Sequence, residues 1–143
     1  MGKIRHASAA SRFYGIECEE EMQGLLALRA DKVSRIAATA KLPTVYVDYI
    51  STAPWNYEQF LGLINDKGRF RGCGRIFMAA AVTLSLERGY NGRVSLHSLI
   101  DAENFYRNVC GMTDMGIDLK YEGLLYFEMT SSQAKEFMGR TRI

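Results

Sequence analysis

The segment 69–74, RFRGCG, carries the clearest chemical signal of the sequence, and it leads into an apolar run from Arg75 to Arg88. The run predicts a buried helix, whose first backbone N–H groups and dipole favour an anion. Gly72 and Gly74 allow close approach of a phosphate, although glycines before a helix are also common turn residues. The segment therefore indicates a phosphate-binding loop, with an ordinary turn as the alternative.

The elements that would position this loop are a strand before it and a strand–helix pair after it. Thr44–Ile50 is rich in β-branched and aromatic residues and predicts a strand. Gly89 is a suitable C-cap for the helix that follows the loop. Arg93–Leu99 predicts the next strand. Asp101 is expected to cap a helix whose apolar stripe consists of Ala102, Phe105, Tyr106 and Val109.

The flanking regions predict further strands and a last helix. Arg12–Cys18 and Gln23–Arg29 form a hairpin pattern, whereas Asp31–Leu42 is ambiguous between a short helix and a loop. Leu119–Met129 is expected to supply a final strand or two. A capping-box pattern at Thr130 predicts a short C-terminal helix. Together these elements predict a layered α/β or α+β domain.

Length and composition are those of one globular domain, expected at 12–143 after a flexible arm at 1–11. A net charge of +2, with dispersed charges, gives no argument for a nucleic-acid partner. The three cysteines are widely spaced and form no CxxC pair, so neither a disulfide framework nor a metal site is expected. No leader and no apolar run of membrane-spanning length are seen, which predicts a cytoplasmic protein without a membrane partner.

Two motifs in a fixed order resemble the GCN5-related N-acetyltransferases. The R-x-x-G-x-G loop at 69–74 is similar to the family's pyrophosphate loop, and AENFYRNVCGM at 102–112 is similar to its A-x-x-F-Y-x-x-x-G-F segment. Shorter segments at 53–56, 96–99 and 126–130 resemble an uncharacterised bacterial branch of this superfamily. The resemblance implies an acyl-CoA N-acyltransferase-like fold, with a mixed, mostly antiparallel central sheet flanked by helices.

The same resemblance implies acetyl-CoA as the acyl donor, with its pantetheine arm along the Thr44–Ile50 strand. It gives Tyr106 the role of general acid toward the departing thiolate; a buried packing residue is the alternative. Cys73 is more typical of a small residue in a tight loop than of a nucleophile. The residues implied to bind the coenzyme are Tyr49, Ile50, Ser51, Arg69, Arg71, Gly72, Cys73, Gly74, Arg75 and Phe105.

A general base for the amine is less clearly indicated. Asp48, Glu58 and His97 are candidates, although water can also take the proton, and a lone histidine in a strand is commonly structural. Trp55 and Tyr57 are candidates for an acceptor groove, with a core or interface position as the alternative.

The expected activity is acetyl transfer from acetyl-CoA to a primary amine by direct attack. Family members usually begin with a strand and two helices that build much of the acceptor pocket, and the region before Arg12 is too short for them. The alternative is therefore a coenzyme A-binding or assembly module of the same fold, completed by a dimer mate or partner. A homodimer is expected. A nucleotide-binding protein is a third possibility, but the loop lacks the Gly-Lys-Ser/Thr ending of a P-loop.

Overall fold

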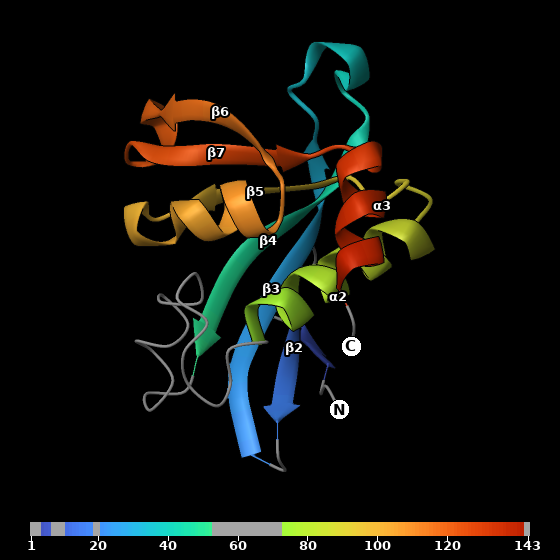
Figure 1. Ribbon diagram of the computed structural model, residues 1–143, viewed down its shortest axis with the longest axis vertical. Helices are drawn as coiled ribbons and strands as arrows, with labels where there is room; N and C mark the ends of the chain where they lie inside the picture. The colour runs from blue at the N-terminus through green and yellow to red at the C-terminus, as the bar shows by residue number, and fades with distance from the viewer. Residues whose placement is uncertain (1–3, 7–10, 19–20, 53–72, 142–143) are drawn as a thin grey trace.

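The computed structural model describes residues 4–6, 11–18, 21–52 and 73–141, which form one seven-stranded sheet with helices against it (Figure 1). The spatial order is β1-β2-β3-β4-β5-β7-β6. The β4–β5 pair is parallel and every other pair is antiparallel, which confirms the mixed, mostly antiparallel sheet. The strands are β1 (Ile4–His6), β2 (Ser11–Cys18), β3 (Glu21–Val33), β4 (Pro43–Thr52), β5 (Val94–Ser98), β6 (Thr113–Asp118) and β7 (Leu124–Met129).

The two α-helices among the described residues and the helical turns between β5 and β6 pack on one face of this sheet. The helix α2 (Cys73–Glu87) precedes β5, and α3 (Ser131–Arg140) follows β7. Between β5 and β6 lie the 3₁₀ turn η4 (Ile100–Ala102) and the π-helix η5 (Phe105–Val109). In Figure 1 these segments all lie in front of the strands. The 3₁₀ turns η1 (Ala37–Thr39) and η6 (Leu119–Tyr121) follow β3 and β6, respectively.

A single apolar core fills the space between the sheet and these helices. It forms because alternate residues of β3, β4, β5 and β7 point to this face, while α2 is apolar on nearly every side. Phe77 of α2, Phe127 of β7 and Phe137 of α3 are all fully buried in it. Gly92 is required where α3 packs closely: its φ is +86°, and a Cβ there would lie 2.8 Å from the Cβ of Ala134.

Most of the expected elements are present. The hairpin is confirmed as β2 and β3, and the apolar helix as α2. Gly89 ends α2 with a φ of +81°, as expected of a C-cap glycine. Thr130 and Gln133 exchange the two hydrogen bonds of a capping box at the start of α3. The ambiguous region after Asp31 continues β3 to Val33 and then contains only the short turn η1.

Two expectations require correction. Asp101 does not cap the helix after β5; the N-cap is Leu99, which makes no side-chain capping bond. The strand β6 begins at Thr113, earlier than the expected Leu119–Met129 region. It was not predicted because its two aspartates and its glycine weaken the apolar alternation. In the expected arm at 1–11, Ile4–His6 forms β1 and pairs with β2. The division of the chain at residue 12 stays a prediction.

Candidate functional site

The parallel strands β4 and β5 run together over a short distance and then part. Their ladder contains three residue pairs and ends at Val47 and Leu96, whereas β4 continues along β3 to Thr52. Figure 1 shows the second half of β4 turning away from β5. Beyond Val47, the edge of β4 that faces β5 is thus outside the β4–β5 ladder. An extended ligand could lie in this opening and form backbone hydrogen bonds with the edge of β4 that is outside the ladder.

A β-bulge lies where the strands part. Ala27 of β3 is opposite Tyr49, and Leu28 is opposite Val47, so Asp48 is the extra residue on β4. A bulge bends its strand and increases the local twist, which explains why β4 leaves β5 at this point. Tyr49, Ile50 and Ser51, predicted to lie along the coenzyme, follow the bulge in β4.

The helix α2 begins within the predicted phosphate-binding segment 69–74. The helix begins at Cys73, and its first turn contains no acidic residue. Gly74 is buried and Arg75 is half-buried. Unpaired N–H groups and the helix dipole favour a negative group here. Six of the predicted coenzyme, substrate and base residues lie outside the described residues: Trp55, Tyr57, Glu58, Arg69, Arg71 and Gly72.

Tyr106 lies in a distorted helix on the same face as α2. The backbone N–H of Cys110 donates to the carbonyl of Phe105 at 3.0 Å, a π-type bond that takes the place of the regular helix expected from the apolar stripe. π-Turns are frequent at functional sites. Phe105 and Tyr106 are buried, with ring centroids 5.3 Å apart, and the Tyr106 ring also contacts Phe127. Burial raises the pKa of the Tyr106 hydroxyl, which therefore stays protonated at neutral pH.

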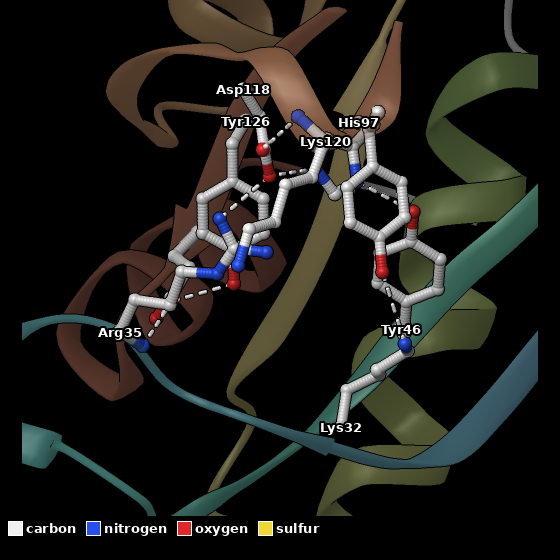
Figure 2. Close-up of polar contacts among 9 residues, drawn as sticks. Lys32, Arg35, Tyr46, His97, Asp118, Lys120 and Tyr126 are labelled. Carbon is white, nitrogen blue, oxygen red and sulfur yellow. Dashed lines mark hydrogen bonds and ion pairs between the residues drawn. The ribbon is translucent and has the colours of Figure 1, made fainter.

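The opposite face of the sheet carries a polar network centred on His97 (Figure 2). Its Nδ1 lies 2.6 Å from the hydroxyl of Tyr46, and its Nε2 lies 2.9 Å from Oδ2 of Asp118. The ring stacks on Tyr121 at 3.9 Å between centroids, and its side chain is only 3% exposed. Burial lowers the pKa of His97, so the neutral imidazole is favoured.

The charge of Asp118 determines the proton positions in this network. Oδ2 of Asp118 also accepts from Nη1 of Arg35 at 2.7 Å. The hydrogen bonds from His97 and Arg35 lower the pKa of Asp118 to about 2. An ionised carboxylate can only accept, so Nε2 of neutral His97 carries the proton and Nδ1 accepts from the hydroxyl of Tyr46. Burial raises the pKa of Tyr46 to about 12, which keeps that donor protonated.

Glu128 forms a second, buried part of the network. Its carboxylate accepts from the hydroxyl of Ser34 at 2.7 Å, from the backbone N–H of Arg35 at 2.5 Å and from the hydroxyl of Tyr126 at 2.7 Å. The guanidinium carbon of Arg35 also lies 4.0 Å from the centroid of the Tyr126 ring. These contacts fix the β3–β4 connection to β7.

The predicted base candidates are in different environments. Asp48 is exposed at the bulge, and its charge acts on the side chains of Arg29 and Tyr46. His97 has partners at both ring nitrogens, so the structure places it in the polar network and not at an open position. In the described ranges, no group of three or more metal-ligating side chains occurs.

No pattern in the sequence indicated Arg35, Asp118 or Glu128 as members of a polar network. Glu128 is separated by 93 residues in sequence from Arg35, its partner. Arg35 lies in the region that was ambiguous between helix and loop. Only the topology, which brings the β3–β4 connection over β7, places these charges together.

The sequence matches no protein-family model and no curated protein. Solved structures match it at low identity. The KacTA–DNA complex has a TM-score of 0.60 at 15% identity, covering 95% of this chain and 77% of that chain. A tyrosine-to-phenylalanine mutant of the AtaT toxin, bound to the C-terminus of the antitoxin AtaR and acetyl-CoA, has a TM-score of 0.55 at 19% identity, covering 90% and 72%.

A third structure is FeeM, an N-acyl amino acid synthase from uncultured soil microbes. Its TM-score is 0.59 at 11% identity, covering 99% of this chain and 86% of that chain. Among the described residues, no helix has the length and apolarity needed to cross a membrane. The strand order, the parting of β4 and β5 and these three likenesses show that the chain has the fold of the GCN5-related N-acetyltransferases.

Proposed function

We propose that the protein transfers an acetyl group from acetyl-CoA to a primary amine. The observation that carries this proposal is the parting of β4 and β5 at the Asp48 bulge. The helix α2, whose N-terminus favours anions, packs against the same sheet. Two proteins of similar fold support the choice of chemistry: AtaT in complex with acetyl-CoA, and FeeM as an N-acyl amino acid synthase.

The chain would position the donor through its backbone. The pyrophosphate would bind at the start of α2, close to Gly74 and Arg75, with the loop residues Arg69 and Arg71 adding charge. The pantetheine arm would lie along β4 beyond Val47. Backbone N–H groups there would polarise the thioester carbonyl, because donors aimed at a developing oxyanion stabilise it.

The reaction would proceed by direct attack. The amine nitrogen forms a bond to the carbonyl carbon, the C–S bond breaks, and in net a proton passes from the amine to the coenzyme sulfur. Asp48 or water would accept the amine proton first. Tyr106, held neutral by burial, would give its proton to the departing thiolate, and the proton taken from the amine would then restore the Tyr106 hydroxyl. In this proposal His97 keeps Tyr46 and Asp118 in place and takes no proton from the amine.

A second candidate is a coenzyme A-binding or assembly module that lacks a complete acceptor pocket. One observation favours it: only residues 7–10 separate β1 from β2, where the related family usually has two helices. Such a module would bind acetyl-CoA without turnover until a dimer mate or a partner completed the pocket.

Thiol release from acetyl-CoA over a panel of amines separates the two candidates. The transferase predicts amine-dependent release that falls at least tenfold in Tyr106→Phe, in line with a typical general-acid contribution. Tyr90→Phe is the matched control, because the Tyr90 hydroxyl makes only a 3.4 Å contact with the carbonyl of Ala30. Coenzyme binding without release on any amine would favour the module and contradict the transferase.

A further inference from the structure

A pocket of about 610 Å³ lies beside the polar network, on the β6 side of the sheet. Arg35 and Lys120 line it together with exposed apolar side chains of the β6 end: Ile117 is 67% exposed and Leu119 is 87% exposed. Tyr126 forms part of its wall. The pocket thus combines two cations with an apolar rim.

The electrostatics of this pocket favour an anion. Among the described residues that line it, Asp118 is the only carboxylate, and both Arg35 and His97 already share its charge. The Arg35 side chain is 46% exposed, and its planar guanidinium suits a carboxylate or a phosphate. Figure 2 shows Lys120 beside Asp118, to whose Oδ1 its backbone N–H donates at 3.1 Å.

The pocket lies within reach of the point where β4 leaves β5. Neighbouring strands are about 4.8 Å apart, so about 10 Å separates β4 from β7, which carries Tyr126, at the last paired residues of β4 and β5. Arg35 is linked to Tyr46 of β4 through Asp118 and His97, and Asp48 lies two residues after Tyr46 in the same strand. The ring of Tyr121, stacked on His97 of β5, offers an apolar surface beside this network.

We infer that the acceptor is an amine that also carries a carboxylate or phosphate group, held by Arg35 and Lys120. Its amine would reach the Asp48 bulge, and its carbon chain would contact Tyr121, Ile117 or Leu119. This inference rests on the proposed function, because it assigns the chemistry of the second substrate of the same reaction.

Binding of ligands that resemble the acceptor or the acetylated product tests the inference without requiring turnover. Protein saturated with coenzyme A is titrated with N-acetylleucine and with N-acetylleucinamide, which differ only in the carboxylate. Phosphoethanolamine and ethanolamine form the corresponding phosphate pair. We expect at least one anion to bind tenfold or more tightly than its neutral counterpart. The pair that shows this preference tells whether the pocket binds a carboxylate or a phosphate.

Lys120→Glu is the decisive variant, because Lys120 is exposed and its side chain can be changed without disturbing the core. It should weaken binding of the preferred anion at least tenfold and leave the affinity for the neutral ligand unchanged. Lys135→Glu, at an exposed position of α3, is the charge-matched control and should have no effect.

The outcomes separate this inference from the proposed function. If neither anion is preferred, or if Lys120→Glu binds the anion as tightly as the wild type does, the inference is wrong. Coenzyme A binding, followed in the same titrations, reports on the proposed function instead. Failure of the coenzyme to bind would contradict the transferase, whatever the anions do.

Discussion

The two faces of the sheet are built by different physical means. The helix-covered face is apolar and densely packed, with Phe77, Phe127 and Phe137 fully buried. The opposite face, around the end of β5, joins its segments through charged hydrogen bonds to Asp118 and Glu128. Apolar burial is non-directional and supplies most of the stability, whereas charged hydrogen bonds are directional and fix geometry.

The two faces also meet at the proposed reaction centre. Tyr106 approaches from the apolar face, and the network that holds Tyr46 and His97 lies on the polar face, with the β4–β5 parting between them. Because apolar burial supplies most of the stability, substitutions in the apolar face should lower the free energy of unfolding most. Substitutions in the polar face should alter local geometry and lower the free energy of unfolding less.

The largest effect is expected from Phe127→Ala, which removes a fully buried ring from the core. Loss of a buried phenylalanine side chain should lower the free energy of unfolding by about 3–5 kcal/mol. The measurement is urea denaturation. Leu119→Ala is the control, because its side chain is 87% exposed and its effect should stay within about 0.5 kcal/mol. Equal losses in both variants would refute the assignment of the core to this face.

Glu128→Gln should produce the next largest effect. Glutamine keeps the shape but places an amide NH₂ against donors, because the carboxylate accepts from Ser34, Arg35 and Tyr126. We expect a loss of about 2 kcal/mol, the usual range for hydrogen bonds to a buried charged group. A double-mutant cycle with Tyr126→Phe should show coupling between the two positions, and additive losses would contradict the contact.

Acidification should destabilise the polar face in two steps. The folded pKa of His97 is lowered by burial below the usual value of about 6.5, so the unfolded chain takes up that proton first. Stability therefore begins to fall as the pH drops below about 6.5. The pKa of Asp118 is about 2 in the folded state. Its contribution is present above the unfolded value of about 3.9 and is lost as the pH falls toward 2.

Urea midpoints measured between pH 8 and pH 2 check this assignment. His97→Gln should flatten the first decline and Asp118→Asn the second. A wild-type midpoint that does not change over both windows would show that neither group differs between the folded and unfolded states.

The smallest effect is expected from Tyr46→Phe, which removes one hydrogen bond to His97. The loss should be about 1 kcal/mol. The more specific readout is the nitrogen NMR spectrum of the His97 ring, which should show the Nε2–H tautomer in the wild type, because Nε2 faces ionised Asp118. Observation of the Nδ1–H tautomer at neutral pH would contradict the hydrogen-bond directions described above.

The difference between the two faces also explains what the sequence could predict. The apolar face follows from local patterns: the continuous apolar run of α2, the β-branched and aromatic residues of β4 and the capping box at Thr130 all identify their elements. Tyr106 is a candidate general acid through the family resemblance of its segment, and this role stays a prediction. The polar face was not predicted, because Ser34 and Arg35 meet Glu128 only through the topology of the sheet. The π-turn at Tyr106 has no composition signature of its own.

The bulge at Asp48 could not be predicted for the same reason, because it depends on pairing between segments that are distant in the sequence. The strand and its residue composition were predictable, but the register of β4 against β3, and hence the place where β4 leaves β5, depends on pairing between distant segments. The proposed coenzyme site therefore required both a sequence motif and a tertiary arrangement.

Calorimetric titration with acetyl-CoA tests the proposed coenzyme site most directly. We expect saturable binding to the folded protein, and at least tenfold weaker binding when Arg69 and Arg71 are both changed to alanine. Arg88→Ala, at the exposed end region of α2, should bind as the wild type does. Absence of binding at millimolar acetyl-CoA, or equal affinity in the loop variant and in the Arg88→Ala control, would contradict the proposed site.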